Sequence, residues 1–413
     1  MEQIGPRRAI TRRGFLKGAG AVAFGAPYVI TSDALGGAGR PPASERIVMG
    51  FVGMGGQGTG DMRGFLGFKQ VQGVAVCDVV GGHRYRAKDH VDKRYGNTDC
   101  AAVADFRQVV RRDDIDAVFI GTPDHWHAII GVDAMKHGKD VYCEKPETLT
   151  VYEGRRMVQT ARRYGQVFAG GSQRVWGDYN WLHQMVWGGA IGRPQEAWVN
   201  VGGPSRLCDL PPVDTPADVD WDMWLGQAPW RPFHPSLIRG GFRSWRDYSG
   251  GGMTDWGCHG FGGALYCLQL HETGPVEVIP PDGKDHERLT YVFANGVRIY
   301  HGGGWGGILS FRGTEGETPP RDRRNRPSPP DVHVPNYKGR GGIFGDFLHC
   351  VRTRERPFRD IEIAHRTASH CHIGNIAYWL KRPLKWDPIK EQFIGDEEAN
   401  RWLSRPMREP WRL

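Results

Sequence analysis

The stretch Arg46-Ile-Val-Met-Gly-Phe-Val52, followed at once by Gly53-Met-Gly55-Gly-Gln-Gly58, decides the fold of this chain. The first part is apolar enough for a buried strand, and the glycine-rich turn then leads into a predicted helix. A second apolar strand, Val71–Cys77, ends at Asp78. A Gly-x-Gly-x-x-Gly turn between strand and helix, with an acidic residue about 20 positions further on, is typical of a dinucleotide-binding βαβ unit.

The glycines of this turn have separate physical roles in such a unit. Gly53 permits the tight turn, Gly55 lets the backbone approach a pyrophosphate, and Gly58 allows the helix to pack closely on the strand. The N-terminus of the helix offers free N–H groups and a partial positive charge to phosphate. We therefore predict that the cofactor contacts the whole turn, including Gly56 and Gln57.

Asp78 indicates which dinucleotide the sequence favours. Its carboxylate would accept hydrogen bonds from the adenosine ribose hydroxyls, and its charge would repel a 2′-phosphate. The sequence therefore predicts NAD rather than NADP, although Arg84 and Arg86 lie close enough along the chain to keep NADP open.

Strands and helices continue to alternate after this unit. We expect strands at Ala117–Ile120, Asp140–Cys143 and Val167–Gly170, and helices at His125–His137 and Val151–Tyr164. This alternation predicts an α/β fold with a parallel, doubly wound Rossmann sheet, which we place in residues 44–171.

The pattern changes in the second half. Tyr291–Ala294 and Val297–His301 flank Asn295-Gly296, which is a strong hairpin signal. We therefore predict a C-terminal α+β domain, residues 172–413, with a mostly antiparallel open sheet. It includes a Pro-, Gly- and Arg-rich exposed loop at 312–342 and helices at Ile343–Thr353 and Ile363–Leu380.

The N-terminal segment matches an export signal. Thr11-Arg-Arg-Gly-Phe-Leu-Lys17 fits the twin-arginine consensus, and a short apolar stretch, Gly18–Ile30, follows it. We expect residues 1–43 to be a signal peptide and linker, read by the twin-arginine export machinery, and the protein to be periplasmic or on the cell surface. Since that compartment holds no free nicotinamide pool, the cofactor would have to be tightly bound.

Charge and composition exclude several classes of protein. Residues 1–40 contain six basic and two acidic residues, so half of the formal net charge of +8 lies in the expected signal and linker. The remainder is a mild bias that gives no reason to expect nucleic acid as a partner. No segment after the leader has the roughly 18 uninterrupted apolar residues of a membrane span. The eight cysteines form no CxxC pair and have no zinc-ligand spacing, so we predict no metal.

Two further motifs carry chemistry. Cys143-Glu-Lys-Pro146 ends the fifth strand of the predicted parallel sheet, and ligands bind at the carboxyl ends of such strands. Gly250-Gly-Gly-Met-Thr-Asp255-Trp-Gly-Cys-His259 places Asp255 and His259 four residues apart, on one face of a helix.

Together, the Rossmann pattern and these two motifs resemble the Gfo/Idh/MocA family, which includes glucose–fructose oxidoreductase, inositol dehydrogenase and rhizopine-catabolism enzymes. The resemblance implies that Lys145, Asp255 and His259 are catalytic and contact substrate. Hydride would pass between a hydroxyl-bearing carbon of a sugar or polyol and the nicotinamide. We expect His259, with a near-neutral pKa, to be the general base, Asp255 to orient it, and Lys145 to stabilise alkoxide charge. The sequence leaves open which of Lys145 and His259 takes the proton.

Weaker matches extend the predicted site. Thr122-Pro-Asp-His-Trp-His127 follows the fourth strand, and the resemblance implies that Thr122, Pro123 and His127 lie near the cofactor, with Asp124 where the family often has Asn. Glu144 and Lys145 complete the expected cofactor site. Gln173 and Arg174 follow a strand and resemble the start of the family's substrate region. Where many relatives have an Asp three residues after the active-site His, this chain has Gly262.

Three functions stay open at this point. The first is a sugar oxidoreductase with bound NAD(P). The second is a redox-neutral lyase or glycosidase that oxidises a sugar transiently, which would need a further acid/base group such as Tyr179, Tyr248 or His234. The third is a non-catalytic sugar- or NAD-binding protein. By resemblance alone we expect a homodimer or homotetramer.

Overall fold

The computed structural model describes residues 40–413, so the twin-arginine motif and the apolar stretch after it lie outside the described residues. The chain divides into two compact units, residues 1–46 and 47–413. In its described part the first unit contains one short 3-10 helix, η1 (Ala43–Glu45). All sheets and longer helices described below belong to the second unit.

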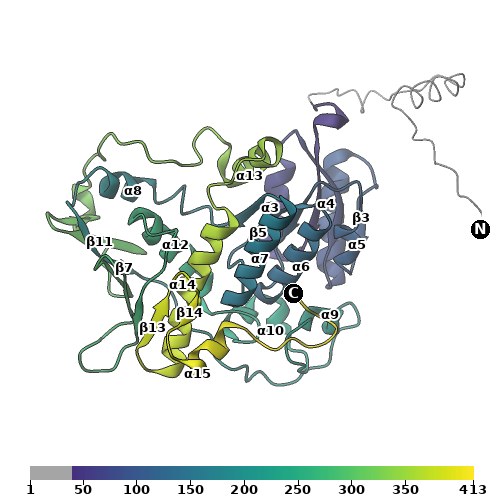
Figure 1. Cartoon of the computed structure of the whole chain (residues 1–413). Coiled ribbons are helices and arrows are strands. Elements are labelled where there is room, and N and C mark those ends of the chain that lie inside the picture. Colours follow the sequence, from purple (N-terminus) through teal and green to yellow (C-terminus); the bar gives the residue numbers. More distant parts are fainter. Residues whose placement is uncertain (1–39) are drawn as a thin grey trace, which may run out of the picture. The chain divides into compact units, whose positions relative to one another are not determined.

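The first sheet of the second unit is a doubly wound parallel sheet, as predicted. Its six strands have the order β3-β2-β1-β4-β5-β6, and every pairing is parallel. The strands are β1 (Ile47–Val52), β2 (Val71–Cys77), β3 (Ala101–Val103), β4 (Ala117–Ile120), β5 (Asp140–Glu144) and β6 (Phe168–Gly171). The helices between them are α3 (Gly56–Leu66), α4 (Gly81–Tyr95), α5 (Arg107–Val110), α6 (Asp124–Lys136) and α7 (Val151–Tyr164) (Figure 1).

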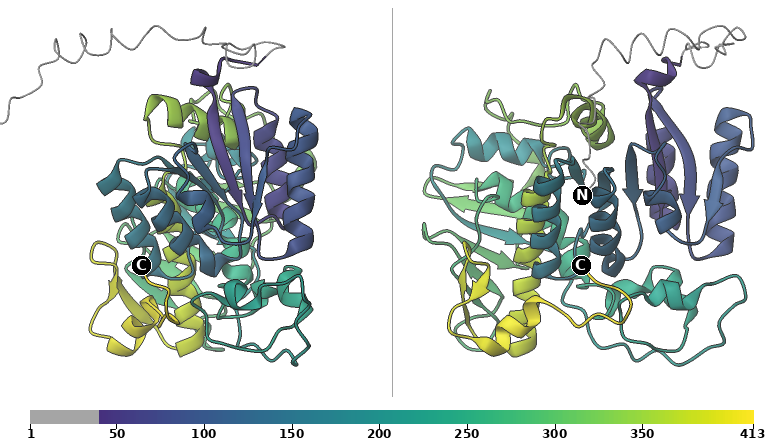
Figure 2. Two further views of the ribbon diagram at one scale, coloured as in Figure 1. Left: turned by 90° about the vertical axis from the view of Figure 1, so that its right-hand side faces the viewer. Right: turned by 45° about the vertical axis from the view of Figure 1, so that its right-hand side comes forward.

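The strand order places a ligand site at one end of this sheet. The chain leaves β1 for β2 on one side and returns to β4 on the other, so the loops after β1 and β4 diverge at the carboxyl ends of adjacent strands. Crevices at such reversal points bind ligands in doubly wound folds. β1 is buried along nearly its whole length, as expected for a central parallel strand covered by helices on its faces (Figure 2).

The second sheet has eight strands in the order β12-β11-β7-β10-β9-β8-β13-β14 and is antiparallel except for the β7–β10 pair. The predicted Asn295-Gly296 hairpin joins β9 to β10, with Gly296 at φ +85°. The strands are β7 (Pro194–Val199), β8 (Glu277–Ile279), β9 (Thr290–Val292), β10 (Arg298–His301), β11 (Leu309–Gly313), β12 (Glu317–Thr318), β13 (Leu384–Asp387) and β14 (Gln392–Phe393). This confirms the predicted mostly antiparallel sheet.

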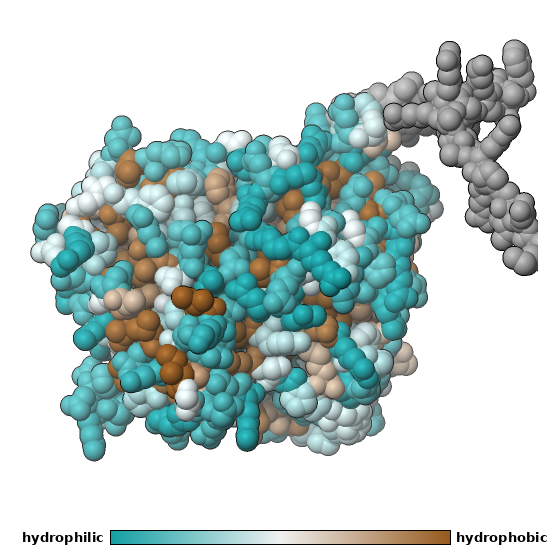
Figure 3. Space-filling model, viewed as in Figure 1, coloured by the Kyte–Doolittle hydropathy of each residue, from teal (hydrophilic) through white to brown (hydrophobic). Residues whose placement is uncertain are grey.

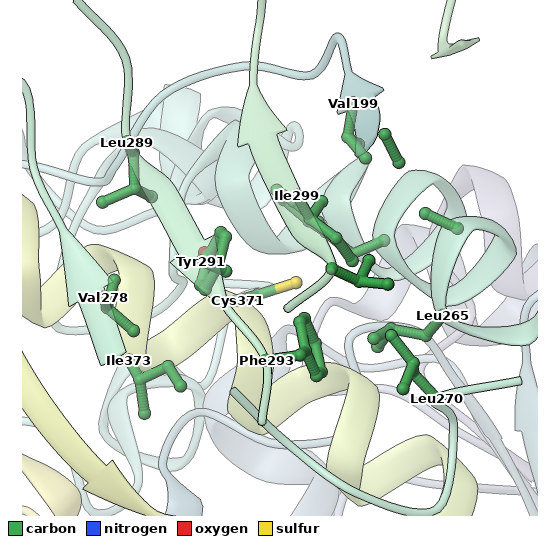
Figure 4. Packing of buried hydrophobic residues seen from close by; sticks show 14 of the residues in the cluster. Val199, Leu265, Leu270, Val278, Leu289, Tyr291, Phe293, Ile299, Cys371 and Ile373 are labelled. Carbon is green, nitrogen blue, oxygen red and sulfur yellow. The ribbon is translucent and has the colours of Figure 1, made fainter. Parts of the chain in front are cut away.

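Helices α12 (Gly257–Cys267) and α14 (Ile361–Leu380) bury one face of this sheet. Their apolar side chains, such as Leu265 and Ile373, belong to one buried cluster with Val278 and Ile299 of the strands (Figure 4). Helix α14 also packs against α7 of the first sheet, so it joins the two halves of the unit (Figure 1). Further helices are α8 (Asn180–Trp187), α11 (Gly252–Asp255), α13 (Gly342–Thr353), α15 (Glu397–Asn400), η3 (Arg323–Asn325) and η4 (Arg401–Leu403).

A compact segment that was not predicted from the sequence lies between β7 and β8 along the chain. We call residues 218–245 the cover segment; it holds α9 (Trp221–Leu225), α10 (Pro235–Ile238) and η2 (Gly241–Ser244). It has its own buried cluster, to which Val80, just before α4, also belongs. The cluster comprises Val219, Trp221, Trp224, Leu225, Ala228, Phe233, Leu237, Phe242, Trp245 and Tyr248.

The loop predicted at 312–342 differs in part from the expectation of an exposed segment. Its start belongs to β11 and β12, and two of its apolar side chains are buried: Val334 is 3% exposed and Tyr337 is 7% exposed. Both pack in the core beside the first sheet, and Tyr337 lies against Trp176. Burial of these two apolar side chains ties down a segment whose composition is otherwise typical of a surface loop.

The outer surface is mixed in polarity. The face drawn in Figure 3 is mostly hydrophilic, with hydrophobic residues scattered among polar ones, which is normal for a folded protein. Among residues 40–413, no helix is both long enough and apolar enough to pass through a bilayer.

Candidate active site

A cavity of about 350 Å³ lies at the carboxyl ends of β1, β2 and β4. One side is the predicted glycine-rich turn with Asp78, Thr122 and Pro123, and the other side is the cover segment. The cover segment contributes Met223, Trp224, Leu237, Ile238, Arg239, Gly240, Phe242 and Arg243. The first wall was predicted from the sequence, and the second was not.

The turn has the geometry that a pyrophosphate needs. Gly53 has φ +85°, and a Cβ on Gly58 would overlap the carbonyl oxygen of Gly53, so neither position accepts a side chain. A Cβ on Gly55 or Gly56 would meet no atom within 4 Å, so the backbone there is open to a ligand. Helix α3 begins at this turn, and no side chain caps its N-terminal N–H groups.

Asp78 is fixed at the cavity wall. Its Oδ2 accepts a hydrogen bond from the Met54 backbone N–H at 2.7 Å, and its Oδ1 accepts one from the Val80 N–H at 2.8 Å. Arg84 donates to the backbone carbonyl of Asp78, whereas Arg86 is exposed and does not line the cavity. A held carboxylate facing an open glycine turn fits the ribose and pyrophosphate of a dinucleotide.

Three charged side chains meet beside the cavity. Lys145, directly after β5, donates from Nζ to Oδ1 of Asp255 at 2.6 Å. Arg243 of η2 donates from Nε to the same oxygen at 3.2 Å. Burial disfavours both charged forms, yet the pairing raises the pKa of Lys145 and lowers that of Asp255. The three groups therefore form an ammonium–carboxylate–guanidinium cluster.

His259 has a different partner from the one expected. Its Nδ1 lies 2.7 Å from Oγ of Ser172, at the end of β6, while Asp255 is occupied by Lys145 and Arg243. The expectation that Asp255 orients the imidazole is therefore wrong for this structure. Asp255 ends α11, and Trp256 separates it from α12, in whose first turn His259 lies.

The environment of His259 also differs from the expected near-neutral pKa. Burial, followed by the charges of Lys145, Arg359 and Arg174, lowers the pKa of His259 to about 3. The sequence could not show this, because burial and the distance to other charges are tertiary properties. Among the described residues, Nε2 of His259 has no recorded hydrogen-bond partner, so a neutral imidazole offers this atom to a ligand.

Other predicted cofactor residues hold together the loops and carboxyl groups around the site. The ring nitrogens of His127 lie 2.7 Å from the Pro146 carbonyl oxygen and 2.8 Å from the Thr122 carbonyl oxygen, so His127 joins the loops after β4 and β5. Glu144 is fully buried, and burial and its neighbour Asp61 raise its pKa. Gln57 donates to Asp61 at 3.0 Å, which links the glycine turn to this carboxyl pair.

The predicted substrate residues lie around an exposed indole. Trp256 is 43% exposed, its ring is 5.7 Å from the His259 ring, and the Arg174 guanidinium stacks over it at 5.0 Å. Arg174 is also paired with Asp178 at 2.6 Å. Gln173 is exposed and follows Ser172, the partner of His259.

The suggested additional acid/base groups differ from Asp124 in their surroundings. Tyr179 and Tyr248 are buried among apolar side chains, and His234 caps α10. Asp124, by contrast, is 3% exposed, and burial raises its pKa to about 7. Its Oδ2 has no hydrogen-bond partner within residues 40–413.

Besides the wall formed by the cover segment, which includes Arg243, three residues of the site were not predicted from the sequence: Ser172, Asp61 and Trp256. Ser172 directly precedes the predicted Gln173, and Trp256 lies inside a quoted motif, so their neighbours along the chain were a usable signal. For Arg243 and Asp61 the sequence offered no such signal. Only the fold determines which distant residues they approach and in which direction their side chains point.

Comparison with known proteins agrees with this architecture. Residues 47–172 match the family model described as the oxidoreductase family, NAD-binding Rossmann fold, and residues 204–413 match its C-terminal alpha/beta domain. Alpha-N-acetylgalactosaminidase of Shewanella oneidensis and glycosyl hydrolase family 109 protein 1 of Shewanella sp. strain ANA-3 are each 34% identical over 175 residues. The match spans 37% of this chain and 37% of each relative.

Solved structures show the same fold at low identity. An NAD-binding protein from Listeria innocua is 18% identical with a TM-score of 0.57, covering 82% of this chain and 97% of that one. Aldose–aldose oxidoreductase from Caulobacter crescentus, complexed with glycerol, is 16% identical with a TM-score of 0.56, covering 82% and 99%. Myo-inositol 2-dehydrogenase from Lactobacillus plantarum is 17% identical with a TM-score of 0.57, covering 82% and 99%. With two family models matched in chain order, this chain belongs to the Gfo/Idh/MocA oxidoreductase family.

Proposed function

We propose that the protein is an enzyme that oxidises a hydroxyl-bearing carbon of a sugar or polyol with a tightly held NAD. The observation that carries this proposal is the double contact of Asp255 Oδ1, which pairs with Lys145 and with Arg243 of the cavity wall. Through Arg243, the Lys145–Asp255 pair is joined to the wall of the cavity to which we assign the dinucleotide. A protein that only binds sugar has no need of such a group.

The residues present assign the proton-handling steps. When bound, the nicotinamide accepts the hydride. Lys145, charged through its pairing with Asp255, donates a hydrogen bond to the substrate hydroxyl oxygen and stabilises developing alkoxide charge. His259, neutral because of its burial, accepts the hydroxyl proton at Nε2, while Nδ1–H donates to Ser172 Oγ. This tautomer is our assignment, and with it we propose His259 rather than Lys145 as the proton acceptor.

The identity of the substrate class rests on the surface around His259. The exposed Trp256 ring offers a flat apolar face of the kind that carbohydrate rings stack on. Arg174 beside it supplies hydrogen-bond donors for substrate oxygens, and Gln173 lies at the rim. A polyhydroxylated ligand fits both features.

Other assignments follow from sequence and cavity together. Asp78 at the cavity wall supports NAD over NADP. We propose that residues 44–171 bind the cofactor and that residues 172–413 bind substrate and form homo-oligomer contacts. The twin-arginine motif supports export to the periplasm or cell surface. A cavity with walls on two sides suits a cofactor that stays bound in that compartment rather than one that exchanges.

A redox-neutral glycosidase or lyase is the second candidate function. The relatives in Shewanella are named as glycosidases, and their matching region is 34% identical to this chain. Such a cycle needs a second acid, and Asp124, a buried carboxyl with a pKa of about 7, is the group that supports it. It replaces Tyr179, Tyr248 and His234 as our candidate.

One experiment separates these functions. The protein, purified with its nucleotide, is incubated with a panel of sugars and glycosides, and product masses are measured. A product two hydrogens lighter than its substrate, in an amount limited by bound nucleotide unless a carbonyl acceptor is added, supports the oxidoreductase. Release of an aglycone without net oxidation supports the glycosidase or lyase. If no substrate changes in mass, although the nucleotide binds, the proposal fails.

A further inference from the structure

Arg243 belongs to two sites at once. Together with Phe242 and Gly240 it lines the dinucleotide cavity, and its Nε donates to Asp255, which does not line that cavity. Its guanidinium also lies over the Phe242 ring at 4.7 Å, and its Nη1 donates to the Gly240 carbonyl at 3.3 Å. The side chain is therefore held between the cavity wall and the catalytic carboxylate.

The cover segment that carries Arg243 is fixed to the first sheet at its opposite end. Gly81 donates to the Asp218 carbonyl at 2.8 Å, and Asp220 donates to the Val79 carbonyl at 3.0 Å. These contacts adjoin Asp78, the residue proposed to bind the adenosine ribose. A dinucleotide in the cavity would touch the cover segment from Met223 and Trp224 to the turn that carries Arg243.

We propose that Arg243 is a positioning residue that couples occupancy of the dinucleotide cavity to the Lys145–Asp255 pair. A bound dinucleotide holds η2 in the position at which Arg243 reaches Asp255. Asp255, with part of its charge engaged by Arg243, then holds the Lys145 ammonium in place. The acid–base group is assembled with the cofactor and loosens when the cofactor leaves.

Thermodynamic linkage makes this coupling reciprocal. If the dinucleotide favours the Arg243–Asp255 contact, the contact must favour the dinucleotide by the same factor. Asp255→Asn should therefore weaken dinucleotide binding, although Asp255 is no part of the cavity wall. The inference requires that the cavity binds a nicotinamide dinucleotide, but it does not depend on which sugar is oxidised.

A double-mutant cycle on nucleotide affinity tests the coupling. Cofactor-free wild type, Arg243→Met, Asp255→Asn and the double variant are titrated with NADH by calorimetry, without any sugar. NADH is chosen because its nicotinamide ring is uncharged. We expect each single change to weaken binding about tenfold, within the usual range of coupling between sites, and the double variant to be no weaker than the weaker single variant.

Two outcomes would overturn the proposal. The first is unchanged affinity in Asp255→Asn. The second is a loss of NADH affinity in the double variant that equals the product of the losses in the two single variants. A purely electrostatic effect is recognisable by repeating the cycle with NAD⁺, whose positive ring would then bind Arg243→Met more tightly and Asp255→Asn more weakly.

Arg239 provides the matched control, because it also lines the cavity but is exposed and has no recorded contact with Asp255. The effect of Arg239→Met should multiply with that of Asp255→Asn. If Arg243→Met does not fold, Arg243→Lys replaces it in the cycle, with a smaller expected loss because the charge is kept. Nucleotide binding with intact coupling but no sugar turnover would contradict the proposed function and leave this inference standing.

Discussion

Nζ of Lys145 lies 2.6 Å from Oδ1 of Asp255, although 110 positions separate the two residues in the chain. Lys145 comes from the end of a parallel strand and Asp255 from a short helix after the cover segment. The contact joins the half of the molecule that holds the parallel sheet to the half that holds the mostly antiparallel sheet.

Replacing Lys145 tests the catalytic assignment most directly. Lys145→Met removes the donor that stabilises alkoxide charge, while Arg243 still neutralises Asp255, so the fold should be kept. We expect kcat to fall by roughly 10²–10³-fold or more, the usual cost of one oxyanion donor. Steady-state kinetics on the identified substrate give kcat, and NAD titration should show affinity within a few-fold of wild type. Turnover close to the wild-type rate would exclude Lys145 from the mechanism.

His259 should be neutral across the physiological range. Because burial and nearby cations lower its pKa to about 3, its ring should show no NMR titration above about pH 5. The acid limb of the pH profile of kcat/KM should therefore not arise from His259 near pH 6.5. Ser172→Ala, which removes the partner of Nδ1, should lower kcat without moving that limb. The opposite result would be an acid limb of kcat/KM near pH 6.5 that coincides with the NMR titration of the His259 ring. It would show that His259 has an ordinary pKa when the cofactor is bound.

Trp256 should contribute to substrate affinity. Trp256→Ala removes a stacking surface worth about 1 kcal/mol, so KM should rise about fivefold with little change in kcat. Trp230 is the control, since it is 65% exposed and lies outside the site. Trp230→Ala should leave KM unchanged. Equal effects of the two substitutions would mean that Trp256 does not bind the substrate.

Gly56 and Gly60 separate cofactor contact from helix stability. Both are exposed glycines of α3 at which an added Cβ would meet no atom within 4 Å, but only Gly56 lines the cavity. Gly56→Ala should weaken NAD binding about tenfold or more, because its methyl group occupies the path of the pyrophosphate. Gly60→Ala should leave affinity unchanged and stabilise the fold by roughly 0.5–1 kcal/mol. Calorimetric titration and thermal unfolding measure the two effects, and equal NAD affinity in both variants would place the pyrophosphate elsewhere.

His370 should make the fold sensitive to acid. It is stacked on Tyr291 at 3.7 Å, neither ring nitrogen has a partner within residues 40–413, and burial lowers its pKa to about 3. The unfolded chain takes up this proton near pH 6.5 and the folded chain only near pH 3, so stability present above pH 6.5 is lost as the pH falls through this window.

His370→Phe should remove that contribution. We expect the free energy of unfolding at about pH 5 to rise by roughly 1 kcal/mol or more, since an unsatisfied polar group and its protonation are both removed. Urea unfolding at pH 5 and pH 8 measures it, and His333→Phe at an exposed position should change neither value. A variant that is less stable at both pH values would show that the larger ring does not fit.

The sequence predicted the parts of the molecule that depend on local pattern. The glycine turn, Asp78 and the β9–β10 hairpin all follow from residues close together in the chain, and the structure has each where expected. The cover segment was missed because its helices are only four or five residues long, too short for a periodic pattern to stand out. Short elements of this kind are stabilised by tertiary packing rather than by propensity.

The site was predicted as a set of residues but not as a set of contacts. Asp255 and His259 were found from their motif, yet the spacing suggested that they pair, whereas Asp255 binds Lys145 and Arg243 and His259 binds Ser172. Spacing along a helix restricts which residues share a face, but it does not show which distant charge approaches that face. The low pKa of His259 and the raised pKa of Asp124 likewise come from burial, which only the folded chain defines.

The separate aromatic cluster of the cover segment has a consequence for protein engineering. Because Trp221, Trp224 and Phe233 pack in a cluster of their own and Trp224 also lines the cavity, substitutions there would change how fast the nucleotide escapes while leaving the glycine turn unchanged. The residence time of the nucleotide would then become a design variable. A library confined to this cluster could turn a self-contained catalyst into one that exchanges its coenzyme with a recycling partner.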